Sequence, residues 1–92
     1  MEITTIGRAG TLESNDVMIT VDFTKDDGLI IEIESIVAAQ FEEQIRAAIH
    51  EVLEDMRISK GHIQVVDKGA LDFAIKARLK TAIKRAEGGN QS

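Results

Sequence analysis

The chain has 92 residues, of which 43% are hydrophobic and 29% are charged, and its formal net charge is -5. This length and balance are typical of one small globular domain. The sequence contains no cysteine, which excludes disulfides, zinc–thiolate sites, iron–sulfur clusters and thiol nucleophiles. No apolar run is long enough to span a membrane, and the start of the chain has no secretory signal pattern, so we expect a cytoplasmic protein without membrane contact.

The charge is unevenly distributed along the chain. Residues 1–60 carry 13 acidic and 5 basic side chains, whereas residues 61–92 carry 6 basic and 3 acidic ones. An acidic total repels the phosphates of nucleic acids at long range, so we do not expect nucleic-acid binding. The basic C-terminal segment suits contact with an acidic protein surface or with bound phosphate groups.

The first half of the chain shows the alternation of strands. Ile3 and Ile6 indicate a strand within residues 3–10, although two glycines weaken the signal. Apolar and polar residues then alternate on either side of Lys25-Asp26-Asp27-Gly28, which is a turn signal. Residues 17–35 are therefore predicted to form a β-hairpin closed by the Asp-Gly turn.

The second half combines two helices with a short strand. Apolar spacings of three and four from Val37 to Met56 predict an amphipathic helix, with Ser35 as N-cap and Lys60-Gly61 as the stop signal. Residues 62–66 are β-branched and predict a third strand. A second helix follows, and its apolar stripe extends over residues 71–86.

These elements predict an α+β fold. We expect a two-layer sandwich in which a small, mostly antiparallel sheet of three or four strands is covered by two helices, in the order (β)ββαβα. Residues 1–87 are expected to form the single domain, and residues 88–92 a flexible C-terminal tail.

The residues offer little for catalysis. A serine hydrolase built on Ser14 and His62 would lack an oxyanion-hole motif and a third triad member, and no cluster has metal-ligand spacing, so we expect neither catalytic residues nor a metal site. The unusual segment is residues 9–18, which is polar and turn-like and precedes a predicted strand. Taken by itself, this segment is a surface loop in which Asn15-Asp16 turns the chain and Ser14 is a neutral linker residue.

Two blocks of sequence carry a resemblance to a known family. The first block is Ala9-Gly10-Thr11-Leu12-Glu13-Ser14 followed by Asp16-Val17-Met18, and the second is Asp67-Lys68-Gly69-Ala70-Leu71-Asp72 followed by Arg78. With these blocks the chain resembles, over roughly residues 1–87, the citrate lyase acyl carrier protein, which is the gamma chain of that complex. It departs from the family pattern at Asn15, often Gly or Ser, and at Phe73, often Cys.

The resemblance implies a non-catalytic carrier. In the family a serine carries the cofactor, and the residue that matches it here is Ser14. The implied cofactor is phosphoribosyl-dephospho-coenzyme A, in full 2'-(5''-phosphoribosyl)-3'-dephospho-CoA, which is joined covalently to the serine through a phosphodiester. Its thiol would carry acetyl and citryl thioesters between an alpha chain (CoA-transferase) and a beta chain (lyase) during cleavage of citrate to acetate and oxaloacetate. A prosthetic-group transferase is the third implied partner. The absence of cysteine agrees with this role, because a chain without its own thiol must obtain one from an attached cofactor.

A further hypothesis concerns phosphates. The start of the second predicted helix, around Lys68-Gly69-Ala70, offers free N–H groups and a lysine to an anion, with Lys68 and Gly69 as the candidate ligands. Alternatively, Gly69 only gives the backbone freedom at a helix entry. Other carrier classes remain as alternatives, namely the malonate decarboxylase type and the helical phosphopantetheine type. A cofactor-free interaction module that holds larger subunits together is the remaining alternative.

Overall fold

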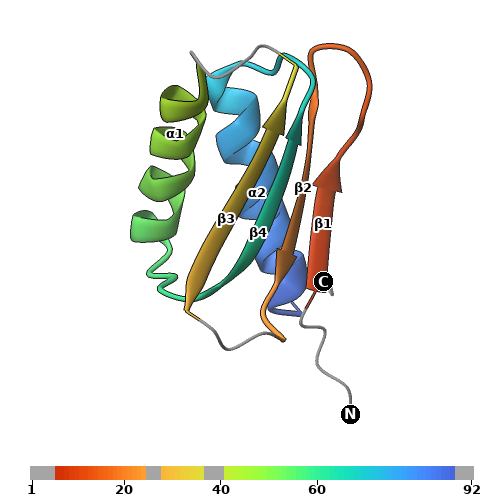
Figure 1. Ribbon diagram of the computed structural model, residues 1–92. Helices are drawn as coiled ribbons and strands as arrows, with labels where there is room; N and C mark the ends of the chain where they lie inside the picture. Colours follow the sequence, from red (N-terminus) through yellow and green to blue (C-terminus); the bar gives the residue numbers. More distant parts are fainter. Residues whose placement is uncertain (1–5, 25–27, 37–40, 89–92) are drawn as a thin grey trace.

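The computed structural model describes residues 6–24, 28–36 and 41–88, which form one four-stranded sheet with two helices on one of its faces (Figure 1). The strands are β1 (Ile6–Gly10), β2 (Val17–Asp22), β3 (Leu29–Ser35) and β4 (Gly61–Asp67), and the helices are α1 (Glu42–Asp55) and α2 (Asp72–Ala86). The predicted α+β class, two layers and element order are thereby confirmed. Within the described residues, neither helix is long and apolar enough to cross a membrane.

The sheet is mixed, with strand order β1-β2-β4-β3. β1–β2 and β2–β4 pair antiparallel, as predicted for most of the sheet, whereas β3–β4 pair parallel. The predicted hairpin over residues 17–35 is therefore wrong, because β4 lies between β2 and β3. Alternation showed that both segments are strands with one buried face, but it does not identify their partners. The parallel pair instead uses α1 as its crossover connection.

The predicted boundaries of the first helix also need correction. α1 begins at Glu42 with Phe41 at the cap position and no side-chain cap, and it ends at Asp55. Ser35 is not its N-cap, because Ser35 ends β3 and its hydroxyl donates to Asp67. Gly61 is not a helix stop but the buried first residue of β4. Residues 37–40 of the predicted helix lie outside the described residues.

The other predicted elements are confirmed where the structure describes them. The N-terminal strand occupies Ile6–Gly10, the third predicted strand extends to Gly61–Asp67, and the second helix covers Asp72–Ala86. Residues 89–92 of the predicted tail lie outside the described residues. The division of the chain into residues 1–87 and 88–92 stays a prediction.

The core lies between the helices and one face of the sheet. Every second residue of the two central strands faces it, and each of these side chains is at most 1% exposed: Val17, Ile19 and Val21 from β2, and Ile63 and Val65 from β4. The helices contribute buried residues such as Ile49, Leu53, Ile75, Leu79 and Ile83. The opposite face of the sheet carries the alternate residues, including Thr20, Gln64 and Glu32. The structure thus has one buried and one open sheet face.

Close contact between α2 and β1 depends on Gly7. A β-carbon added at Gly7 would lie 2.2 Å from the carbonyl oxygen of Ala82 and 2.3 Å from the amide nitrogen of Ala86. Both atoms belong to the helix backbone and have no rotamer by which to move away. A residue without a side chain at this position therefore sets the distance between helix and sheet.

We expect Gly7→Ala to lower the free energy of unfolding by about 2 kcal/mol or more, because the added methyl group overlaps backbone atoms. Urea unfolding, monitored by circular dichroism, measures this change in the free energy of unfolding. Gly28→Ala is the matched control, since no heavy atom lies within 4 Å of a β-carbon at Gly28, although its φ of +88° adds strain. Equal losses in the two variants would contradict the close-approach explanation.

Candidate functional site

Ser14 is exposed on the loop that connects β1 to β2. The N–H of Asp16 donates to the carbonyl of Glu13 at 3.1 Å, which closes a tight turn around Ser14. Asn15 has a φ of +67°, a left-handed conformation that asparagine adopts more readily than most residues. Among the residues that the structure describes, none hydrogen-bonds the Ser14 hydroxyl. The side chain is thus available to another molecule.

The segment after β4 anchors this turn. The N–H of Asn15 donates to the carbonyl of Lys68 at 2.8 Å, and the N–H of Lys68 donates to the carbonyl of Asp16 at 2.9 Å. Gly69 follows with a φ of +99°, and a β-carbon there would lie 3.4 Å from Oδ1 of Asn15. The two sequence blocks that carry the family resemblance therefore meet in space at Ser14.

Asp16 ties the turn to α2 through its carboxylate. Oδ2 accepts from the Thr11 hydroxyl at 2.6 Å, and Oδ1 accepts from the N–H of Val17 at 2.7 Å. The Arg78 guanidinium donates from Nε to Oδ1 at 3.2 Å and from Nη2 to Oδ2 at 3.0 Å. The Thr11 hydroxyl, the Val17 amide and Arg78, in that order, lower the pKa of Asp16 to about 2. The carboxylate is therefore charged throughout the neutral range.

Asp67 forms a second junction at the same end of the molecule. Its side chain is 1% exposed, which makes it the one polar or charged residue among the described ones that is buried. Oδ1 accepts from the N–H of Ala70 and Oδ2 accepts from the Ser35 hydroxyl, each at 2.9 Å. One carboxylate thus joins the end of β3, the end of β4 and the approach to α2, and its desolvation is offset by these hydrogen bonds.

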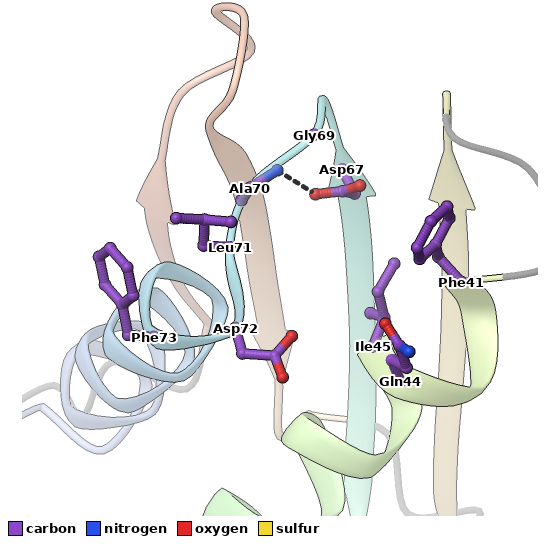
Figure 2. A pocket seen from close by; sticks show the side chains of 9 residues that line it. All are labelled: Phe41, Gln44, Ile45, Asp67, Gly69, Ala70, Leu71, Asp72 and Phe73. Atoms are coloured by element: carbon purple, nitrogen blue, oxygen red, sulfur yellow. Dashed lines mark hydrogen bonds between the residues drawn. The ribbon is translucent and has the colours of Figure 1, made fainter.

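Two hollows adjoin the turn. The larger has a volume of about 510 Å³ and lies between the starts of the two helices, with Phe41, at the cap position of α1, on one side and Phe73 from α2 on the other (Figure 2). The smaller, of about 410 Å³, is lined by Asn15, Gly69, Leu71, Phe73 and Ala74. The β1–β2 loop, which contains Ser14, and the starts of both helices lie at the same end of the molecule (Figure 1). The lining residues therefore place both hollows at the end that carries Ser14.

Lys68 and Gly69, the residues of the phosphate hypothesis, lie beside the turn. Two of the three N–H groups offered to an anion are already donating, since that of Lys68 bonds Asp16 and that of Ala70 bonds Asp67. Asp72 in the first turn of α2 also complements the helix terminus. The groups left for binding a phosphate are therefore the Lys68 side chain and the Gly69 backbone, and the phosphate hypothesis stays a prediction.

His62 does not approach Ser14. In the β2–β4 ladder Val17 pairs with Asp67, whereas Asp22 at the far end pairs with His62. Five residue steps of about 3.3 Å, or roughly 16 Å, separate these two pairs. His62 instead places Nε2 at 3.0 Å from Oε1 of Glu32 on the open sheet face. The two residues therefore do not form a nucleophile–base pair.

The structure also reveals contacts that sequence reasoning missed. The pairing of Asp16 with Arg78 was not predicted, although each belongs to one of the two resembling blocks and their opposite charges were a usable signal. The bond from Ser35 to Asp67 was missed because Ser35 was interpreted as a helix cap. Both contacts join residues that are distant in sequence, and periodicity does not detect such pairs.

We expect Asp16→Asn to remove a pH-dependent part of the stability. The folded-state pKa of about 2 lies below the ordinary aspartate value, so the charged carboxylate stabilises the fold above about pH 4, and this contribution is lost as the pH falls towards about 2. Urea unfolding should therefore show wild type more stable than the variant near neutral pH, with the two curves converging near pH 2.

Glu13→Gln is the matched control for this experiment, because Glu13 is an exposed acid in the same turn. Its stability should follow that of wild type across the range. A constant difference between wild type and Asp16→Asn from neutral pH to about pH 2 would contradict the assigned role of the carboxylate charge.

Comparison with known proteins identifies the family. A family model described as "ACP: Malonate decarboxylase delta subunit (MdcD)" matches residues 5–86. Proteins named "Citrate lyase acyl carrier protein" are similar to the chain: that of Fusobacterium nucleatum is 42% identical and covers 98% of this chain and 96% of its own length. Those of Halothermothrix orenii and Haemophilus influenzae are 45% and 51% identical over 97% and 94% of this chain, and over 94% and 88% of their own lengths.

A solved structure shares the fold. One chain of a Pseudomonas malonate decarboxylase hetero-tetramer in complex with malonate superposes with a TM-score of 0.73 at 16% identity, over 92% of this chain and 88% of that one. The family model and the sequence relatives each match most of the chain. The chain therefore belongs to the family of citrate lyase acyl carrier proteins and malonate decarboxylase delta subunits.

Proposed function

We propose that this chain is the acyl carrier subunit of a citrate lyase, and that Ser14 holds its prosthetic group. The observation that carries the proposal is the Ser14 turn: an exposed hydroxyl on a loop that Asn15 and Asp16 anchor to Lys68, and that Asp16 anchors to Arg78. The relatives named citrate lyase acyl carrier protein, at 42% to 51% identity, support the same assignment.

The turn fits a large group attached through phosphate. Attachment needs a hydroxyl that an enzyme can reach, and Ser14 is exposed while its neighbours are held in place. In the attachment step, the Ser14 Oγ–phosphorus bond forms as the bond from that phosphorus to the leaving group of an activated donor breaks, and the hydroxyl proton passes to a base of the attaching enzyme. We propose phosphoribosyl-dephospho-coenzyme A as the group, which supplies the thiol that the cysteine-free chain lacks.

The role of the protein is then carriage rather than catalysis. A long tether raises the effective concentration of a thioester at two successive active sites. The partners in this proposal are an alpha subunit that exchanges acyl groups, a beta subunit that cleaves the citryl group, and the enzyme that attaches the cofactor. We propose the cytoplasm as the place where the complex works.

A malonate decarboxylase carrier is the second candidate. The family model and the fold of the malonate decarboxylase chain favour it. The higher identity, 42% to 51% against 16%, lies with proteins named for citrate lyase. The helical phosphopantetheine carriers are a weaker candidate, because Ser14 lies on a turn between two strands and not at the start of a helix.

We expect the intact mass of the chain, produced together with its attaching enzyme and partner subunits, to rise by the mass of phosphoribosyl-dephospho-coenzyme A, with peptide mapping placing the increase on Ser14. Ser14→Ala should abolish both the increase and citrate cleavage by the complex while the subunits still assemble, since Ser14 is exposed and none of the described residues bonds its hydroxyl.

Ser59→Ala is the matched control, because Ser59 is also exposed but lies between α1 and β4. It should retain the mass increase and the activity. An unmodified wild-type chain from a complex that cleaves citrate would refute the proposal, and a simple phosphopantetheine mass would assign the chain to another carrier class.

We expect Lys68→Glu to slow attachment of the cofactor to Ser14 by roughly three- to tenfold, because the substitution places a negative charge beside the turn that would bear the phosphate. The rate of mass increase with purified attaching enzyme measures the effect. Lys80→Glu carries the same charge change at an exposed position on α2 and should leave the rate close to that of wild type. Equal rates for Lys68→Glu and wild type would show that Lys68 has no role in binding the phosphates.

A further inference from the structure

Exposed apolar side chains gather at the end of the molecule that carries Ser14. Among the described residues, seven large hydrophobic side chains are exposed. Five of them lie in or next to the segments at the Ser14 end: Leu12, Ile36, Phe41, Leu71 and Phe73. The other two, Ile6 and Ile30, lie at the beginnings of β1 and β3, which are at the far end of the sheet (Figure 1). Such a concentration marks a binding surface.

The two hollows at this end share part of their lining. Gly69, Leu71 and Phe73 line both of them, while Asn15, the neighbour of Ser14, lines the smaller one. We call the two hollows together the helix-start groove. Its smaller part begins at Asn15, and its larger part is the space between Phe41 and Phe73, which Figure 2 shows. Its larger part, at about 510 Å³, is within the size range of small-molecule sites.

The charges of the helix-start groove select for a neutral occupant. Its larger part contains the carboxylates of Asp67 and Asp72, and the other lining side chains there are apolar apart from the amide of Gln44 (Figure 2). Asp67 is already bonded to Ser35 and Ala70. Phosphates are repelled by these carboxylates, whereas an uncharged chain with amide groups finds apolar walls and a hydrogen-bonding amide.

We propose that the helix-start groove shelters the neutral, amide-containing arm of the group on Ser14, together with its thiol or thioester end, between visits to the partner subunits. This inference rests on the proposed attachment to Ser14. Because the arm is tethered beside the groove, even weak binding suffices. At an effective concentration of about 1 mM, a Kd of roughly 0.1 to 0.5 mM keeps the arm docked for about 70 to 90% of the time.

The absence of cysteine makes the test direct, since the arm then carries the only thiol of the loaded protein. The measurement is the second-order rate of that thiol with a neutral dipyridyl disulfide, compared with free pantetheine over a range of pH so that changes in thiol pKa are separated from changes in access. We expect the loaded wild type to react about three- to tenfold more slowly than free pantetheine.

Two variants locate the protection. Leu71→Ser with Phe73→Ser removes two lining side chains that are 64% and 71% exposed, so the fold should persist, and the rate should rise to that of free pantetheine. Leu12→Ser is the matched control: Leu12 is 57% exposed and lies in the Ser14 loop, but it lines neither hollow. This control should keep the protection of wild type.

Each outcome has a defined meaning because the intact mass is recorded on the same samples. A loaded wild type that reacts as fast as free pantetheine overturns the groove proposal and leaves the attachment intact. Equal loss of protection in Leu12→Ser and the double variant also overturns it. An unmodified Ser14 overturns the proposed function and, with it, the occupant of the groove. If a variant fails to fold, the wild-type comparison still tests the proposal, because a loaded wild type as fast as free pantetheine overturns it.

Discussion

The carboxylate of Asp16 is the interaction on which the functional end of this protein depends. It receives hydrogen bonds from its own loop through Thr11 and Val17, and a two-point contact from Arg78 on α2. A two-point contact to a guanidinium fixes direction as well as distance. The loop is therefore held in one position relative to α2. Ser14, two residues before Asp16, is exposed on this fixed base.

A fixed base with an exposed hydroxyl is what a carrier needs. In the proposed function, the attached arm supplies the reach, whereas the protein supplies a fixed surface for contact with partner subunits. The mixed sheet serves this arrangement, because β3 and β4 end on the same side and both helices begin there. The ends of these four elements and the β1–β2 loop thus combine into one surface (Figure 1).

Sequence periodicity predicted which segments are strands or helices but not which strands pair. Val17, Ile19 and Val21 have the alternation of a half-buried strand whether their neighbour is β3 or β4. The end of β3 was misassigned because Ser35 suits a helix cap equally well, and only the buried Asp67, 32 residues away, shows its use. Ser14 was predicted as the attachment residue through family resemblance alone, since its residue type and local context are those of an ordinary loop.

The central position of β4 determines when the chain can complete its fold. β4 separates β2 from β3 in the sheet, yet it follows both of them and α1 in the sequence. The emerging chain therefore cannot complete its sheet until residues 61–67 are available, and folding awaits contacts between distant segments. Lys68, which anchors the Ser14 turn, comes later still. The surface around Ser14, the proposed attachment residue, is thus completed only after residues 61–68 are available, which places folding before the proposed modification.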